Sequence, residues 1–206
     1  RVKAIAFAGL PFIEIEILDR YDFGQEFFRW EFATAVAGSV IGINPFSQPD
    51  VESAKVEARK LTDEYEKTRH LPAQEPFFEE DGISLFTSEM YSLKLHGMID
   101  KQRLAECLSA HLANLTEGDY FAILAYVEMS DENVHLLESM RSAIIQGHPY
   151  PTCLGFGPRF LHSTGQAYKG GPNSGVFLQI TSDDEFDLPV PNQKYTFGVV
   201  KAAQAR

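Results

Sequence analysis

The sequence has few basic residues and no long apolar run. Its 206 residues include 18 Lys and Arg against 29 Asp and Glu, a formal net charge of −11. Without basic clusters, this balance argues against nucleic acid and against an anionic membrane surface as partners. No apolar run approaches the roughly 20 residues that a membrane span needs, and no signal peptide opens the chain. A phosphorylated ligand would depend on local donors, because the overall charge repels it.

Cysteine and clustered histidine are scarce as well. The two cysteines, Cys107 and Cys153, fall in a helical pattern and in an apolar strand, which indicates buried, reduced thiols. The six histidines are scattered without the spacing of a metal site, and no glycine-rich nucleotide loop occurs. We therefore expect neither a metal nor a cofactor, and we expect a cytoplasmic protein.

The composition that remains is that of an ordinary globular protein, with 44% hydrophobic and 23% charged residues. We expect one compact α/β region over residues 1–206, with a mainly parallel sheet flanked by helices. Within it we expect a β/α segment over 1–70, a loop and hairpin over 71–99, and a βαβ segment over 100–206. The chain starts without Met and ends in a helix-favouring run, so we expect a piece of a longer polypeptide.

The first forty residues predict two strands and a buried helix. Residues 2–8 and 12–18 predict strands, the second because isoleucine alternates with glutamate. The dense apolar positions from 23 to 41 predict a buried helix. Segments 12–24 and 176–198 share the order strand, polar loop and Tyr-x-Phe-Gly, which leaves a duplicated half-domain and a chance likeness both open.

A strand, a helix and a second strand form the clearest unit. A strand over 120–127, a helix capped by Ser130 or Asp131, and a strand over 152–156 predict a right-handed parallel βαβ unit. The loop after the second strand carries His162, at the edge where open α/β sheets bind ligands.

A polar pair, Gln48 and Lys55, lies at a loop-to-helix junction. Two prolines fix a tight turn, and an amphipathic helix is expected over 50–69, capped by Asn44 or Ser47. Gln48 then lies at the mouth of the helix, and Lys55 about one and a half turns into it, pointing back toward the loop.

This region resembles the C-terminal signature of the phosphoglucose isomerase family. In that signature an aromatic residue, a polar residue and Gln precede Gly-Val-Glu, and an active-site Lys follows after two further residues. Ser47 stands where Asp or Asn is usual, and Asp50 stands where Gly is usual. The matching positions are Phe46, Ser47, Gln48, Val51, Glu52 and Lys55.

A longer stretch, 153–181, resembles the isomerase part of bifunctional transaldolase/glucose-6-phosphate isomerase proteins. It contains Gly-Pro-Arg-Phe-Leu-His-Ser-Thr-Gly-Gln. In isomerases more widely a His-x-x-Gly-Gln element lies near the substrate, and His162, Gly165 and Gln166 fit it.

Together with Arg-Tyr-Asp-Phe-Gly at 20–24, these likenesses cover most of 12–60 and 118–206, whereas 70–115 carries no motif. The resemblance implies a three-layer sugar-isomerase (SIS-like) fold. It also implies that the protein interconverts glucose 6-phosphate and fructose 6-phosphate through an enediol, without a cofactor. Upstream isomerase and transaldolase segments would belong to the same polypeptide, and a homo-oligomer stays an open arrangement.

The resemblance also implies roles for individual residues. Lys55 would help to open the sugar ring and stabilise developing charge, and His162 would act as acid or base, or contact the substrate. The expected substrate-binding residues are Gln48, Gln166, Ser163, Thr164, Arg159 and Lys169.

The base that moves the proton is the gap in this assignment. In the isomerase family a Glu shortly precedes the His element, whereas residues 154–161 contain no acid. Either an upstream part supplies the base, or the correspondence around His162 is partial, with Glu52 and Glu128 as candidates in this chain. The alternative function is a sugar-phosphate-binding module without catalysis. A shared cleft for Lys55 and His162 would favour catalysis.

Overall fold

The chain forms two compact units. The computed structural model describes residues 2–101 and 103–206, apart from the side chains of Val2 and Ser163. The units are Arg1–Ser47 and Gln48–Arg206. This division differs from the single compact region expected over 1–206, and its boundary falls inside the Gln48 motif.

The first unit contains helices α1 (Val2–Phe7) and α2 (Asp22–Ile41). The strands predicted over 2–8 and 12–18 are wrong, because α1 replaces the first, and residues 10–18 form neither helix nor strand. The backbone N–H and C=O groups of a strand need a neighbouring strand as hydrogen-bond partner. An alternating pattern of side chains does not provide that partner. Of the two segments that share Tyr-x-Phe-Gly, the first therefore lacks the strand that was expected of it.

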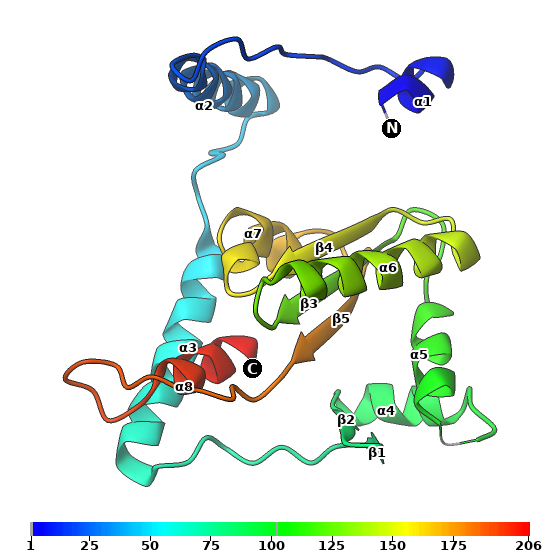
Figure 1. Cartoon of the computed structure of the whole chain (residues 1–206), viewed down its shortest axis with the longest axis vertical. Helices are drawn as coiled ribbons and strands as arrows, with labels where there is room; N and C mark the ends of the chain where they lie inside the picture. The colour runs from blue at the N-terminus through cyan, green and yellow to red at the C-terminus, as the bar shows by residue number, and fades with distance from the viewer. Residues whose placement is uncertain (1, 102) are drawn as a thin grey trace. The chain divides into compact units, whose positions relative to one another are not determined.

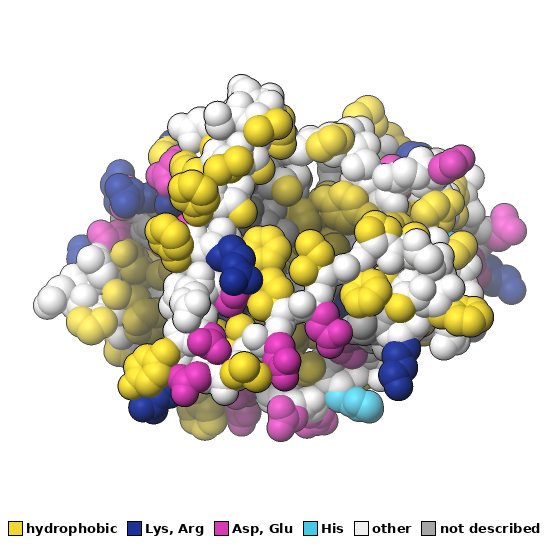
Figure 2. All heavy atoms as spheres, turned by 90° about the horizontal axis from the view of Figure 1, so that it is seen from above, with side chains coloured by type: hydrophobic (Ala, Val, Ile, Leu, Met, Phe, Trp, Pro, Cys, Tyr) yellow, Lys and Arg dark blue, Asp and Glu magenta, His cyan; other side chains and the backbone are white. Residues whose placement is uncertain are grey.

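The predicted helix in this unit is confirmed, but its predicted burial is wrong. Phe27, Trp30 and Phe32 are 67%, 60% and 62% exposed. Among the described residues of α2, only Gly38 is buried. Hydrophobic side chains are spread over the molecular face shown in Figure 2. The apolar pattern of α2 thus finds no core within its own unit.

The second unit is built on a parallel three-stranded sheet in the order β4-β3-β5 (Figure 1). β3 (Tyr120–Tyr126) pairs in parallel with β4 (Thr152–Phe156) and β5 (Gly175–Thr181). α6 (Asp131–Gly147) connects β3 to β4, and the Ser130 hydroxyl caps it. The predicted βαβ unit is confirmed, as is a mixed α/β fold with helices flanking a parallel sheet.

β3 is the central strand, and its side chains alternate between two apolar layers. On one face Ile123 packs with Leu137 of α6. On the other face the Tyr126 ring meets the edge of Phe160 at a centroid distance of 5.2 Å. The second layer contains the short helix η1 (Arg159–Leu161), α7 (Ser163–Gly170) and α8 (Phe197–Ala205).

α3 (Pro49–Thr68) confirms the amphipathic helix predicted over 50–69. Its buried residues are Val51 and Thr62, and it packs against both α7 and α8, as Figure 1 shows. The charged residues on its other side face solvent. The helix that carries Lys55 is therefore anchored on the same layer as the loop that carries His162.

The segment predicted as a loop and hairpin over 71–99 contains the antiparallel pair β1 (Phe78–Glu80) and β2 (Ile83–Leu85). It also contains α4 (Glu89–His96), a helix that the sequence reading missed. α5 (Leu104–Leu112) follows. None of the helices in the described part of the chain has the length and apolar content needed to span a bilayer.

His111 joins α5 to α4 and to the outer edge of β5. Its Nε2 atom donates to the carbonyl of Phe177 at 2.9 Å, since a carbonyl can only accept. Its Nδ1 atom then accepts from the Tyr91 hydroxyl at 2.8 Å, and Asn114 donates to the same hydroxyl at 3.1 Å. Burial lowers the pKa of His111, so the neutral imidazole is the form that this arrangement holds.

Candidate functional site

The two motifs meet where α3 begins. The amide oxygen of Gln166 on α7 accepts hydrogen bonds from the backbone N–H groups of Asp50 at 3.1 Å and Val51 at 3.4 Å. The amide nitrogen of Gln166 donates to Asp50 Oδ2 at 2.5 Å. The first turn of a helix cannot satisfy its own N–H groups. A residue 116 positions away satisfies two of them here.

No neighbouring side chain performs this capping role. Gln48 occupies the N-cap position without a side-chain cap, so the predicted capping by Asn44 or Ser47 is wrong. The Asn44 amide instead accepts from the backbone N–H of Phe46 at 3.0 Å. Pro49 follows as the first helical residue, where its missing N–H leaves no unsatisfied donor.

Gly165 lies where α7 contacts α3. A Cβ atom at this position would lie 3.8 Å from Val51 Cγ2 and 3.3 Å from the carbonyl oxygen of Phe160. Val51 is only 4% exposed. The Gly and Gln of the His-x-x-Gly-Gln element therefore pack and cap, roles that the sequence spacing alone did not reveal.

Gln48, the N-cap residue of α3, and Lys55, within α3, are both exposed. Lys55 Nζ pairs with Glu52 Oε1 at 2.6 Å, and the two side chains are 59% and 66% exposed. Such an exposed pair contributes little to stability, and water or a ligand competes for either partner. The ammonium group is therefore accessible to an anionic or hydroxyl-rich ligand, with a carboxylate directly beside it.

His162 lies between η1 and α7 and is exposed, as is Thr164 in the first turn of α7. The side chain of Ser163 lies outside the described part of the chain, and so does its predicted role in binding. Burial lowers the pKa of Lys169, and the Asp50 carboxylate acts against that shift. Lys169 lies on α7, the helix that also carries Gln166.

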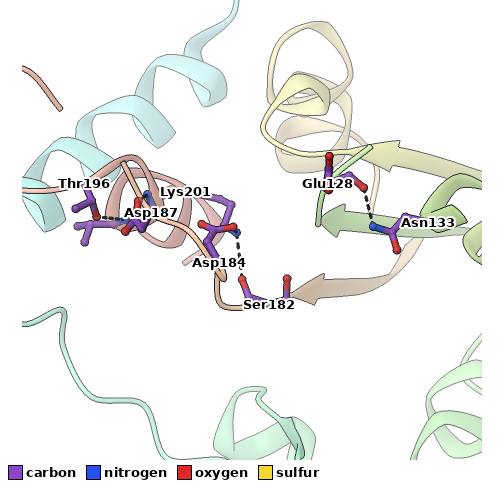
Figure 3. A network of polar contacts seen from close by, with 9 residues as sticks. Glu128, Asn133, Ser182, Asp184, Asp187, Thr196 and Lys201 are labelled. Atoms are coloured by element: carbon purple, nitrogen blue, oxygen red, sulfur yellow. Dashed lines mark hydrogen bonds and ion pairs between the residues drawn. The ribbon is translucent and has the colours of Figure 1, made fainter. Parts of the chain in front are cut away.

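The carboxyl end of β3 contributes a second acidic group. Arg159 reaches from η1 to the sulfur of Met129, with Nη1 3.5 Å from Sδ. The residue before Met129 is Glu128, whose carbonyl oxygen accepts from the Asn133 amide at 2.9 Å (Figure 3). The bond involves only the backbone carbonyl of Glu128, and the Glu128 side chain is exposed. Glu128 and Arg159 therefore belong to adjacent loops at the carboxyl ends of β3 and β4.

The loop after β5 is closed by its own polar contacts, which Figure 3 shows. Lys201 Nζ donates to the Ser182 carbonyl at 3.1 Å and to Asp184 Oδ1 at 2.5 Å. Asp187 Oδ1 accepts from the backbone N–H of Gly198 at 2.7 Å. Burial raises the pKa of Asp187, but hydrogen bonds, including one from Thr196, lower it overall. Sequence reasoning missed this network, and its acids serve to attach the loop to α8.

A hollow of about 460 Å³ lies beside α5 and not beside these motifs. Asp100, Lys101 and Glu106 supply its charged lining. None of the predicted site residues lines it. Within the residues that the structure describes, no three His, Cys, Asp or Glu side chains are grouped to hold a metal ion.

No family model matches the sequence, and no solved structure matches the fold. The candidate site is therefore defined by its own geometry. It comprises two helices in contact, an exposed Lys55 beside Glu52, and an exposed His162 in the loop after β4. This set can donate protons and hold an anion, and it offers carboxylates as bases.

Proposed function

We propose that the chain is the C-terminal part of the isomerase region of a transaldolase/glucose-6-phosphate isomerase polypeptide, with an SIS-like fold. One observation supports it above all, namely the capping of α3 by Gln166. This contact joins the Gln48 and Lys55 motif to the His162 motif, although the two are more than a hundred residues apart in the sequence. Two motifs that serve one substrate must converge, and their helices do.

The proposed reaction interconverts glucose 6-phosphate and fructose 6-phosphate through an enediol. Lys55 donates to the ring oxygen or to developing negative charge, while His162 transfers the ring-opening proton. Gln48 and Thr164 bind hydroxyl or phosphate oxygens, with Arg159 and Lys169 as further cations. Glu52 is the proposed base, because it is the acid already beside Lys55 at 2.6 Å. No cofactor is needed for this chemistry.

The test exploits two matched lysines on α3. Lys55 pairs with Glu52 at 2.6 Å, and Lys60 pairs with Glu57 at 2.7 Å, both in the same i, i+3 geometry and with similar exposure. Only Lys55 belongs to the motif. In a coupled assay of fructose 6-phosphate conversion, Lys55→Ala should lower kcat by about a hundredfold or more. Lys60→Ala should leave it unchanged.

The assay is run on this chain and on the longer polypeptide that we propose. His162→Ala, with the exposed His135→Ala as its control, should also lower kcat strongly. Unchanged kinetics for both Lys55→Ala and His162→Ala in an active protein would overturn the assignment of the site.

The second candidate is a sugar-phosphate-binding module without catalysis. It is favoured by the absence of an acid in residues 154–161 and by the engagement of the Gln166 amide with Asp50. Titration calorimetry with glucose 6-phosphate separates the two functions. Binding that is weakened by Lys55→Ala, without turnover in either polypeptide, would establish the module.

A further inference from the structure

Asp50 is the residue where the Gln48 motif departs from the isomerase signature, and it has contacts of its own. Its backbone N–H and its carboxylate both bond to the Gln166 amide. It lies in the first turn of α3, where the helix dipole also favours a negative charge. Asp50 is therefore bonded to α7 through both its backbone and its side chain.

Gly170 supplies the space that the Asp50 side chain needs. A Cβ atom on Gly170 would lie 2.1 Å from Asp50 Oδ2 and 2.9 Å from Gln166 Nε2. A side chain at position 170 would therefore force the Asp50 carboxylate and the Gln166 amide away from their present positions. The carboxylate at position 50 and the missing side chain at position 170 are thus complementary.

We propose that Asp50, Gln166 and Gly170 form a clasp that holds the start of α3 on α7 and positions Gln48 and Lys55 relative to His162. The positioning part rests on the proposed function, whereas the clasp itself does not. Asp50 and Gln166 act as positioning residues, because their polar groups are already used on each other. Lys169, which lies on α7 with Gln166, adds a positive charge that acts on the Asp50 carboxylate.

The first experiment tests the clasp by stability alone. Gly170→Ala should lower the melting temperature of the full chain by roughly 2–4 °C, because the new methyl group displaces the Asp50 carboxylate from Gln166. In the Asp50→Ala background the same change should have no destabilising effect, since the carboxylate that it would strike is gone. Equal losses in both backgrounds would overturn the clasp.

The second experiment reverses the polarity of the bond. Gln166→Glu places two carboxylates against each other and should lower both the melting temperature and kcat. Adding Asp50→Asn gives position 50 an amide that donates to Glu at 166, while that carboxylate still accepts from the backbone N–H groups of α3. The double variant should recover both values. Failure of this rescue would overturn the proposed pairing.

The third readout separates positioning from stability. Measured well below the melting temperature, Gln166→Glu should lower kcat about tenfold or more with a smaller change in KM, because misplaced groups weaken the transition state more than binding. Asp63→Asn, an exposed change on α3 away from the clasp, should alter neither. Normal kcat in Gln166→Glu would overturn the positioning role even if the clasp stabilises the fold. Normal kcat in Lys55→Ala would instead overturn the proposed function and leave the clasp standing.

Discussion

Helix α2 of the first unit and strand β3 of the second are both rich in large apolar side chains, but only β3 forms a core. Ile123 of β3 is 0% exposed, whereas Ile41 of α2 is 69% exposed. β3 is covered by α6 on one face and by η1, α7 and α8 on the other. The difference shows that apolar composition yields a core only where the topology supplies covering elements on both sides.

The pattern of α2 makes this contrast sharper. Its aromatic residues fall on opposite sides of the helix, with Phe27 and Trp30 on one side and Phe28 and Phe32 on the other. Large apolar side chains on two sides of a helix normally favour burial, even though α2 also carries Asp22, Glu26, Arg29 and Glu31. Among the described residues of Arg1–Ser47, however, only Gly38 is buried. The sequence of α2 is therefore typical of a buried helix, but no other described element of its own unit buries it.

The most direct way to break the comparison is to truncate the same residue type in both elements. Ile123→Ala should destabilise the second unit by about 2–5 kcal/mol, because it leaves a cavity between β3 and α6. Ile41→Ala should change stability by less than about 0.5 kcal/mol, as expected for an exposed position. Denaturant unfolding followed by circular dichroism measures both. A large loss for Ile41→Ala would show that α2 is covered in solution, and the contrast would fail.

The next largest effect concerns His111, which attaches α4 and α5 to the sheet of the second unit. The described part of the first unit has no such sheet. His111→Gln should destabilise the chain by about 1–3 kcal/mol at pH 7.5, because buried partners lose hydrogen bonds. In the wild type the pKa of His111 is lowered from its ordinary value of 6.5. The unfolded chain therefore binds more protons as the pH falls below 6.5 toward the folded pKa, and stability decreases over that window.

Thermal melts between pH 7.5 and 5 check this prediction. The difference between wild type and His111→Gln should shrink as the pH falls, because only the wild type carries the penalty of the buried imidazole. His135→Gln, on the exposed surface of α6, is the control and should show no such loss at pH 7.5. A difference that is constant with pH would mean that the neutral form of His111 is not required.

The smallest predicted effect tests a local signal that both the sequence and the structure contain. Ser130 Oγ accepts from the backbone N–H of Asn133 at 3.3 Å at the start of α6. Ser130→Ala should cost about 1 kcal/mol, the usual contribution of such a cap. Ser139→Ala is the control, since that hydroxyl bonds only to the carbonyl of His135 within the same helix. Chemical denaturation of both variants should show a loss for Ser130 alone, and equal stabilities would remove the cap as the reason why α6 begins there.

For the predicted site residues, the positions along helices and loops were more predictable than the contacts. The spacing of Gln48 and Lys55 placed them correctly at the mouth and in the second turn of one helix, and His162 correctly in the loop after β4. The capping role of Gln166 was not predictable, because nothing local distinguishes a glutamine that binds substrate from one that caps a distant helix. Asn44 and Ser47 offered local caps in the sequence, and only the structure shows that neither caps α3 and that its first turn is satisfied from α7.

The sequence by itself determined the elements whose signals are local. The apolar run of β3, the Ser130 cap of α6 and the amphipathic pattern of α3 each define a segment without reference to the rest of the chain. Only the tertiary structure decided which apolar segments are covered, and it joined Asp50 to Gln166 and Gly170. Residues 12–18 alternate like a strand but form none, because pairing requires a neighbour at hydrogen-bonding distance. Burial, strand pairing and long-range capping depend on partners, and the position of a partner is a property of the fold.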